Sequence, residues 1–269
     1  MRLYFSSRDE KGRSQIGRVD LALDVPARTL AIEVEPIVAF GPLGSFDDSG
    51  VTTSCLVEHE GRQFLYYSGW TLGRTVPFYF YVGCAVSLDG GKTFQKVSPS
   101  PILDRNEVDP YLTASPWVLF EGGVWRMWYV SGMGWSLEKG EPRHRYHIKY
   151  AESHDGLRWQ RTGRVCLDFR DEAEYAIARP CVLKDGELYR MWYPYRGEFY
   201  RIGYAESRDG LSWTRRDDQS GIEPSAEGWD SEMIEYPVIF DMDGQRHMLF
   251  NGNAYGKTGV GWAVLQQNG

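Results

Sequence analysis

The chain has 269 residues, of which 42% are hydrophobic and 14% aromatic, and its formal net charge is -7. This length allows one domain with a complete core, and the negative charge without a basic cluster excludes nucleic acid or an anionic membrane as the main partner. No stretch approaches the length of a membrane-spanning helix. We therefore expect a single domain over residues 1–269.

The N-terminal part predicts three strands that match part of a unit repeated later in the chain. Residues 2–5 match the second strand of that unit, residues 14–23 the third and residues 30–34 the fourth. No segment in front of residue 2 matches the first strand. We expect the chain to start downstream of the start of a longer form, the alternative being that another segment fills this place.

The full unit follows three times, and a fourth copy is incomplete. Each copy has an apolar run, a glycine turn, an aromatic run and a strand that ends in Asp-Gly. The first two runs cover residues 54–67, 115–129 and 179–193, and the later strands cover residues 81–94, 147–159 and 201–213. The last copy covers residues 236–250 and 259–264 and stops before a fourth strand. Such a repeat predicts a radial architecture.

Short strands with tight turns and two incomplete terminal units predict an all-β fold, a five-bladed β-propeller whose N-terminal blade lacks its innermost strand. In residues 87–94 Asp-Gly supplies the hairpin turn, and an aromatic ring packs beneath it. This segment matches the Asp-box pattern of propeller blades. We therefore expect Asp89, Asp155 and Asp209 to be structural.

The cysteines and histidines predict neither a metal site nor a cofactor. Cys55, Cys84, Cys166 and Cys181 lack metal-type spacing, and most lie in predicted strands, where a thiol behaves as a small apolar group. The first ten residues lack the apolar core of a signal peptide. The sequence therefore indicates a reduced, cytoplasmic protein.

The three complete units and the C-terminal unit each have a predicted innermost strand, and at least one acid stands at the start of each of these strands. These starts are residues 46–50, 107–110, 174–180 and 229–237. If they converge on one axis, like charges lie close together and raise some pKa values. This would create the acid and base pair that glycosidic chemistry requires.

These blades, with Gly-x-x-Tyr-x-Met-Trp-Tyr at residues 186–193 and Tyr-Ala-Glu-Ser-x-Asp-Gly-x-x-Trp at residues 150–159 and 204–213, resemble the five-bladed propeller glycosidases. That superfamily comprises glycoside hydrolase families 32, 43 and 68 and the related mannoside phosphorylases. The resemblance implies a base or nucleophile Asp in the first blade, a pKa-tuning Asp in the second and an acid Glu in the third. A missing first strand would shift this order by one blade.

The predicted catalytic residues are Asp48, Asp109 and Glu232. Asp48 and Asp109 match the family positions, although both also fit turn chemistry. Glu232 competes with Glu235, because strand alternation points only one of them into the channel, and an outward Tyr236 would favour Glu235. The predicted substrate-binding residues are Asp47, Glu174, Arg179, Tyr195, Arg196, Glu235, Trp70, Trp135 and Asn251.

Several of these predictions carry a stated alternative. Arg179, placed before proline in an apolar strand, is predicted to contact an anion or a sugar, or to pair with a channel acid. Trp70, Trp135 and Tyr195 are predicted at the rim, where rings stack on sugars. Asn251 would donate to hydroxyl groups or form a turn.

Two functions remain open from these residues. The first is an enzyme that acts on a glycosidic bond by hydrolysis, phosphorolysis or transfer, with a carbohydrate or sugar-containing small molecule as partner. The second is a non-catalytic glycan-binding or accessory propeller of polysaccharide metabolism. A sialidase would need six blades and three clustered arginines. Channel carboxylates beside an open site favour the enzyme, whereas carboxylates occupied by salt bridges favour binding or structure.

Overall fold

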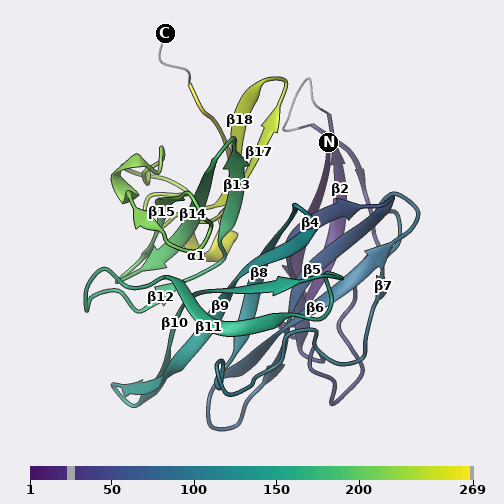
Figure 1. Cartoon of the computed structure of the whole chain (residues 1–269), viewed down its shortest axis with the longest axis horizontal. Coiled ribbons are helices and arrows are strands. Elements are labelled where there is room, and N and C mark those ends of the chain that lie inside the picture. The colour runs from purple at the N-terminus through teal and green to yellow at the C-terminus, as the bar shows by residue number, and fades with distance from the viewer. Residues whose placement is uncertain (23–27, 267–269) are drawn as a thin grey trace.

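The computed structural model describes residues 1–22 and 28–266, and it is built from strands (Figure 1). Helical residues occur in two short segments of this part, η1 (Asp217–Gln219) and α1 (Asn253–Gly256). In α1, Ala254 and Tyr255 have left-handed backbone angles, so the segment is a turn. The all-β prediction is confirmed, and none of the described residues forms a helix long and apolar enough to cross a membrane.

Antiparallel pairing groups the described strands into five consecutive units. The first holds β1 (Arg2–Arg8), β2 (Ser14–Leu21) and β3 (Thr29–Ile32), and the second holds β4 (Gly50–His59), β5 (Arg62–Leu72), β6 (Phe78–Ser87) and β7 (Gln95–Lys96). The third holds β8 (Thr113–Glu121), β9 (Val124–Glu138), β10 (Glu141–Ser153) and β11 (Gln160–Leu167). The fourth holds β12 (Ala176–Ile177), β13 (Cys181–Asp185), β14 (Leu188–Arg196), β15 (Tyr200–Ser207) and β16 (Thr214–Arg215). The fifth holds β17 (Glu235–Met242), β18 (Gln245–Asn251) and β19 (Val260–Val264).

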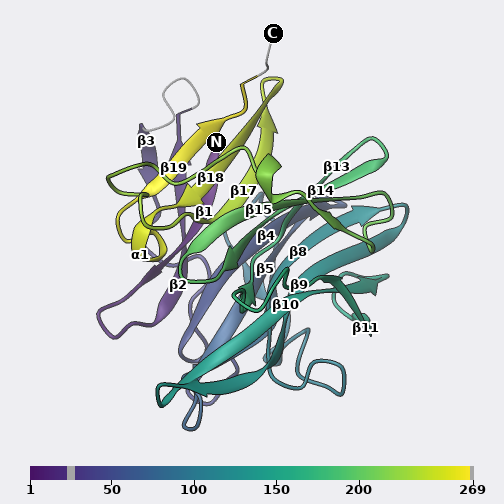
Figure 2. The ribbon, with the colours of Figure 1, turned by 90° about the vertical axis from the view of Figure 1, so that its left-hand side faces the viewer.

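The strands of the N-terminal unit lie close to their predicted places. The third strand, predicted to reach Leu23, is described as far as Leu21, and Leu23 itself lies outside the described residues. Both terminal units lie at the upper end of the molecule in the views of Figures 1 and 2. This arrangement brings the two incomplete units to the same end of the molecule.

One recurring hydrogen bond identifies β1 as a second strand. In two complete units, a second-strand side chain donates to the glycine carbonyl in the Asp-Gly turn of the following unit, and β1 does the same. The bonds are Tyr4 Oη to Gly91, 3.1 Å, Tyr66 Oη to Gly156, 2.9 Å, and Trp128 Nε1 to Gly210, 2.7 Å. Within the described part of the chain β1 pairs only with β2, in agreement with a first unit that lacks its innermost strand.

The hydrophobic core lies between neighbouring units. Successive side chains of β9 point to opposite faces of the sheet. Trp125 and Met127 pack against the second unit, whereas Trp128 and Val130 pack against the fourth. Trp192 lies in the cluster between the fourth and fifth units. Trp128 and Trp192 therefore both pack between neighbouring units.

The Asp-Gly turns are closed by hydrogen bonds to their own backbone. Ser153 Oγ donates to Asp155 Oδ1 over 3.0 Å and accepts the N–H of Gly156 over 3.0 Å. Asp155 Oδ1 also accepts the N–H groups of Leu157 and Arg158. These bonds lower the pKa of Asp155, although burial opposes them. Such contacts give the turn aspartates a structural role.

Replacing Ser153 by alanine should therefore destabilise the fold. The change leaves the buried N–H of Gly156 without its acceptor, which costs about 1–2 kcal/mol. Urea unfolding of Ser153→Ala, with the exposed Ser100→Ala as the matched control, measures this effect. Equal unfolding midpoints for the two variants would contradict it.

Candidate active site

Each innermost strand contains a bulge at the same place. The register shifts at Ser54 in β4, at Ser115–Pro116 in β8 and at Tyr236–Pro237 in β17, and Arg179–Pro180 separates β12 from β13. Ser115, Arg179 and Tyr236 have φ angles of 46°, 37° and 56°. This region is unfavourable for side-chain-bearing residues, and proline makes it more so for the residue before it. Bulges turn side chains in new directions and occur beside active sites.

Arg179 joins the innermost strands of distant units. Its guanidinium donates to the carbonyl of Thr53 in β4, and its Cζ lies 5.1 Å from the ring centre of Tyr236. The N–H of Thr53 in turn donates to Ser6 Oγ in β1 over 2.8 Å. The first, second, fourth and fifth units therefore meet around Arg179. Arg179 and Tyr236 both stand at the irregular positions of their innermost strands.

Glu235 is the buried acid beside this point. Its side chain is 0% exposed, and neither carboxyl oxygen has a hydrogen-bond partner among the described residues. Burial raises its pKa to about 8, and the nearby charges of Arg179 and Arg196 and the neighbouring Tyr236 hydroxyl oppose that rise. A carboxyl with this pKa is mostly protonated at neutral pH. It therefore has the property of a general acid.

Tyrosines from several strands surround this acid. The Tyr146 and Tyr200 hydroxyl groups lie 2.7 Å apart, and the Tyr200 and Tyr236 ring centres are 6.2 Å apart. Burial raises the pKa of all three, so their hydroxyl groups stay protonated at neutral pH. Arg196 lies over the Tyr200 ring at 5.2 Å. We call the set Tyr146, Arg179, Arg196, Tyr200, Glu235 and Tyr236 the tyrosine–arginine cluster.

A neutral imidazole borders this cluster. The His144 ring stacks on Tyr146 with ring centres 4.6 Å apart. Burial and the charges of Arg196 and Arg143 lower the pKa of His144 to about 4. Trp135, predicted at the rim, is half-buried and lies edge-on to His144 at 5.7 Å. Aromatic faces of this kind can pack against a sugar ring.

Tyr236 lies beside Glu235, so the outward Tyr236 that would have favoured Glu235 in the sequence is not found. Glu235 and Tyr236 are consecutive, and strict alternation would send them to opposite faces of the strand. The bulge at Tyr236–Pro237 breaks that alternation, and both side chains lie in the cluster. Sequence reasoning also missed Tyr146 and His144. An X-Pro pair at the same place in three copies was the available signal for the bulge.

The acid at the start of the third unit is held by an ion-pair network. Asp109 is 0% exposed and accepts hydrogen bonds from Tyr129 Oη at 2.9 Å and Ser131 Oγ at 2.6 Å. Lys149 Nζ and Arg161 Nη1 lie 3.2 and 3.0 Å from its oxygens. Its oxygens are already occupied by these four contacts, which favours a structural role. The catalytic role predicted for Asp109 stays a prediction.

The same arrangement recurs in other units. In each of these units, the acid in front of the innermost strand forms an ion pair with a basic residue on the fourth strand. The pairs are Asp47 with Lys96 at 2.6 Å, Asp109 with Arg161 at 3.0 Å, and Glu174 with Arg215 at 2.7 Å. In the second and third units the second-strand tyrosines Tyr67 and Tyr129 also donate to the acid. Asp47 and Glu174, predicted to bind substrate, are thus engaged in ion pairs.

The fifth unit departs from this pattern. Asp230 occupies the acid position and is 6% exposed, but the second strand carries Phe250 in place of the tyrosine. The described part of this unit contains no fourth strand that could supply a cation. Asp230 Oδ1 consequently has no hydrogen-bond partner among the described residues.

Among the remaining predicted residues, Asn251 lies opposite Glu235 on the neighbouring strand β18. Asp48 closes a loop by accepting from Gly44 N–H and Ser49 Oγ, each over 2.9 Å, and the Glu232 side chain is exposed. Trp70 is buried and donates to Ser14 Oγ over 2.8 Å. Tyr195 contacts Arg170 and Arg215, and Asn251 Nδ2 donates to the Tyr255 carbonyl over 3.3 Å. The roles assigned to these residues remain predictions, and the structure brings Arg179, Arg196 and Glu235 together.

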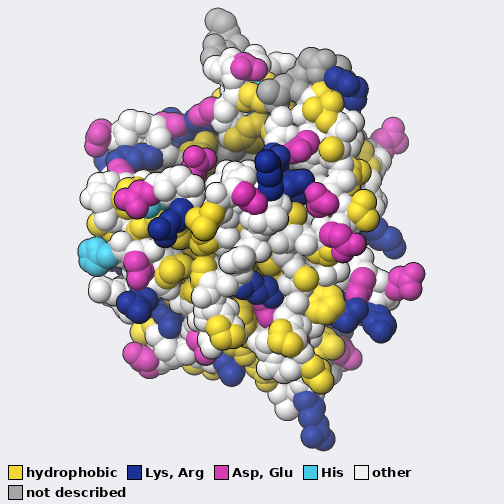
Figure 3. All heavy atoms as spheres, turned by 90° about the vertical axis from the view of Figure 1, so that its right-hand side faces the viewer, with side chains coloured by type: hydrophobic (Ala, Val, Ile, Leu, Met, Phe, Trp, Pro, Cys, Tyr) yellow, Lys and Arg dark blue, Asp and Glu magenta, His cyan; other side chains and the backbone are white. Residues whose placement is uncertain are grey.

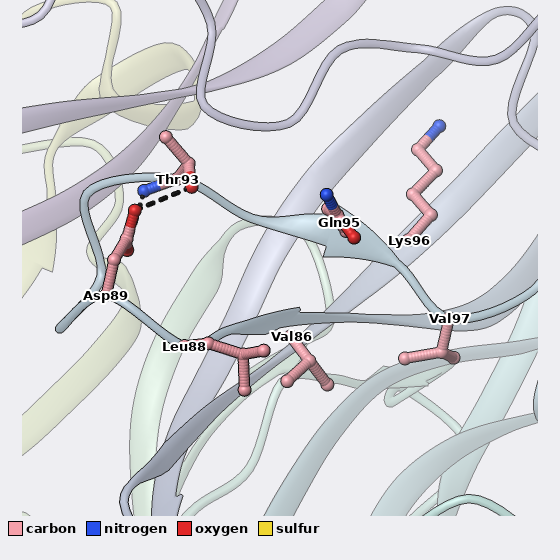
Figure 4. A pocket seen from close by; sticks show the side chains of 7 residues that line it. All are labelled: Val86, Leu88, Asp89, Thr93, Gln95, Lys96 and Val97. Atoms are coloured by element: carbon pink, nitrogen blue, oxygen red, sulfur yellow. Dashed lines mark hydrogen bonds between the residues drawn. The ribbon is translucent and has the colours of Figure 1, made fainter.

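A hollow of about 310 Å³ lies elsewhere, at the turn between β6 and β7 (Figure 4). Asp89 in its wall is bonded to Thr93 within the turn, and Lys96 is paired with Asp47. The other side chains that line it are Val86, Leu88, Gln95 and Val97. The ionised groups of this hollow already have partners, so it offers little for catalysis.

The protonation of Glu235 should appear in the stability of the protein. A carboxyl whose pKa rises from 4.5 to about 8 on folding makes the folded state less stable as pH increases between these values, by about 1.4 kcal/mol per unit. Glu235→Gln should remove this loss. Unfolding free energies of wild type and variant should agree near pH 4 and diverge above about pH 5, with the variant more stable. A constant difference at every pH would contradict it, and exposed Glu232→Gln is the control.

Comparison with solved structures defines the fold as a propeller of the glycoside hydrolase type. A protein described as "Glycoside hydrolase" aligns with a TM-score of 0.75 and 16% identity, covering 100% of this chain and 87% of that one. A thermostable family-43 glycoside hydrolase aligns with a TM-score of 0.72 and 14% identity, covering 100% and 91%. The Bombyx mori GH32 β-fructofuranosidase BmSUC1 aligns with a TM-score of 0.65 and 16% identity, covering 98% and 55%.

Relatives of higher sequence identity define the family. The Mycobacterium tuberculosis proteins "Uncharacterized protein MT1551", from strain CDC 1551 / Oshkosh, and "Uncharacterized protein Rv1502", from strain ATCC 25618 / H37Rv, are 44% identical to this chain over 265 residues. The alignment covers 98% of this chain and 88% of each relative. No protein-family model matches the chain. The chain belongs to the family of these two mycobacterial proteins.

Proposed function

We propose that this protein is a carbohydrate-active enzyme that cleaves or transfers a glycosidic bond, with Glu235 as the general acid. The single observation that carries the proposal is a fully buried carboxyl without hydrogen-bond partners among the described residues and with a pKa raised to about 8. It lies where the innermost strands meet, beside aromatic rings. The likeness of the fold to glycoside hydrolases supports the same function.

In the proposed step Glu235 gives its proton to the glycosidic oxygen as the bond from that oxygen to the anomeric carbon breaks. An acceptor bonds to the anomeric carbon, and the Glu235 carboxylate then regains a proton from solvent. When the acceptor is water, its extra proton leaves to solvent. The hydroxyl groups of Tyr146 and Tyr200 are protonated and can donate hydrogen bonds to the sugar.

Phosphorolysis is a second candidate, favoured by the contacts of the other predicted carboxylates. The carboxylates predicted to act as base are occupied, with Asp109 held by two cations and Asp48 by its own loop. Phosphate carries its own negative charge and attacks without a protein base. Cleavage that depends on added phosphate would support this candidate over hydrolysis.

We also infer that the five units are the five blades of one ring and form a single domain over residues 1–269. The cores between neighbouring units and the contacts of Arg179 support this inference. Figure 3 shows acidic and basic side chains interspersed on one face of the molecule. That mixture supports a sugar rather than a nucleic acid as partner, and the cytoplasmic location remains a prediction.

The test is a survey of chromogenic furanosides and mannosides, with and without phosphate. Wild type should release the chromophore from at least one substrate, and Glu235→Gln should release far less. A wild-type protein that binds these glycosides but cleaves none would instead support the non-catalytic glycan-binding function.

A further inference from the structure

Two arginines of the tyrosine–arginine cluster have no carboxylate partner. Within residues 1–22 and 28–266, no acid lies within salt-bridge distance of Arg179 or Arg196. Several other half-buried arginines are paired with an acid, as Arg161 is with Asp109 and Arg215 with Glu174, although Arg201 bonds only to backbone carbonyls. A guanidinium taken from water without a counter-charge is costly, so these two positions need another explanation.

The bonds that these arginines make leave most of their donors unused. A guanidinium has five N–H donors. Arg179 has one hydrogen bond, to the Thr53 carbonyl, and Arg196 has two, to the Tyr255 hydroxyl at 2.7 Å and the Glu198 carbonyl at 3.4 Å. Both side chains are half-buried, so each keeps part of its surface accessible to solvent.

The neighbouring groups do not neutralise this positive charge. The charges of both guanidinium groups act to lower the pKa of Glu235. Burial nevertheless raises that pKa to about 8, so the carboxyl is mostly protonated at neutral pH. His144 is neutral, since its pKa is lowered to about 4. The tyrosine hydroxyl groups are uncharged. The cluster therefore holds two positive charges without a counter-charge from the described residues.

We propose that the substrate of this site carries an anionic group, the carboxylate of a sugar acid or the phosphate of a sugar phosphate, and that Arg179 and Arg196 bind it. The planar guanidinium matches both oxyanions through paired hydrogen bonds. This inference rests on the proposed function, because it names the class of sugar that the Glu235 site accepts. The anion supplies the missing counter-charge when substrate is bound.

Binding is tested by calorimetry in the Glu235→Gln protein, where turnover cannot interfere. Glutamine keeps the neutral charge of the protonated acid. The probes are matched pairs: galacturonate with galactose, glucuronate with glucose, and mannose 6-phosphate with mannose. Inorganic phosphate alone is a further arm, which separates an anion on the sugar from free phosphate. Each titration is repeated with Arg196→Gln, Arg196→Lys and Arg164→Gln added, where Arg164 is exposed on β11.

At least one anionic sugar should bind at least about 10-fold more tightly than its neutral partner, because one charge-assisted hydrogen bond contributes about this much to affinity. Arg196→Gln should abolish this preference, Arg196→Lys should keep part of it, and Arg164→Gln should leave it unchanged. Equal binding of both members of every pair, or inorganic phosphate that binds as well as any sugar anion, would overturn the inference.

These outcomes are independent of the catalytic proposal. An anion preference together with unchanged turnover in Glu235→Gln would leave this inference standing and remove Glu235 as the acid. Loss of turnover in Glu235→Gln together with equal binding of neutral and anionic sugars would do the reverse. Circular dichroism of each variant confirms that the protein remains folded.

Discussion

Glu235→Gln is expected to lower kcat/KM by roughly 10²- to 10⁴-fold for glycosides with poor leaving groups, the usual contribution of a general acid. Glutamine has nearly the same shape but cannot give up a proton. Glycosides whose leaving group departs without protonation should lose far less activity in this variant. A series of aryl glycosides with leaving groups of increasing acidity measures the effect.

Two control variants sharpen this prediction. Glu227→Gln changes an exposed carboxylate in the loop that precedes β17 and should leave turnover unchanged. Glu232→Gln tests the sequence-based alternative, since Glu232 is exposed in the same segment. An equal loss for all leaving groups would show that Glu235 does not protonate the leaving oxygen, and a loss in Glu232→Gln alone would move the role there.

Asp109→Ala is expected to destabilise the protein by about 3–5 kcal/mol, because it leaves Lys149 and Arg161 half-buried without their counter-charge. Asp109→Asn keeps an oxygen and a nitrogen in the places of the two carboxylate oxygens and should cost less. Urea or thermal unfolding measures both, with the exposed Glu187→Ala as the control.

The same variants separate the structural role of Asp109 from the predicted catalytic one. If Asp109 only holds the third unit together, the activity of folded Asp109→Asn should equal that of wild type. A loss of turnover in that variant, at full folding and without a change of stability, would restore Asp109 to the catalytic set.

The repeat made the architecture predictable from the sequence. The aromatic runs and Asp-Gly turns recur at matching places, and each became a strand or a hairpin. Even the incomplete first unit could be recognised, because residues 2–5 share the pattern of a second strand. These features are local, so they do not depend on how the units are arranged in space.

The site was harder to predict because it depends on contacts between units. The acids at Asp47, Asp109 and Glu174 were conspicuous, yet each pairs with a cation on the fourth strand of its own unit. A basic residue in each last strand, Lys96, Arg161 and Arg215, was the sequence signal for this pairing. It could be interpreted only once the strands were known to pack in this way.

Glu235 itself was one of two open alternatives. Alternation along a regular strand sends consecutive residues to opposite faces, but the bulge places Glu235 and Tyr236 together. The left-handed angle of Tyr236 before Pro237 is unfavourable for an isolated chain. Packing between units imposes it, and no propensity of the local sequence would have predicted it.

The most direct test of the account is the titration of Glu235, which requires no substrate. Infrared difference spectra between wild type and Glu235→Gln, recorded from roughly pH 5 to pH 10, isolate the carboxyl signal of this residue. We expect a protonated carboxyl that ionises with a pKa of about 8. A carboxylate already ionised at pH 5 would contradict the assignment of Glu235 as the acid.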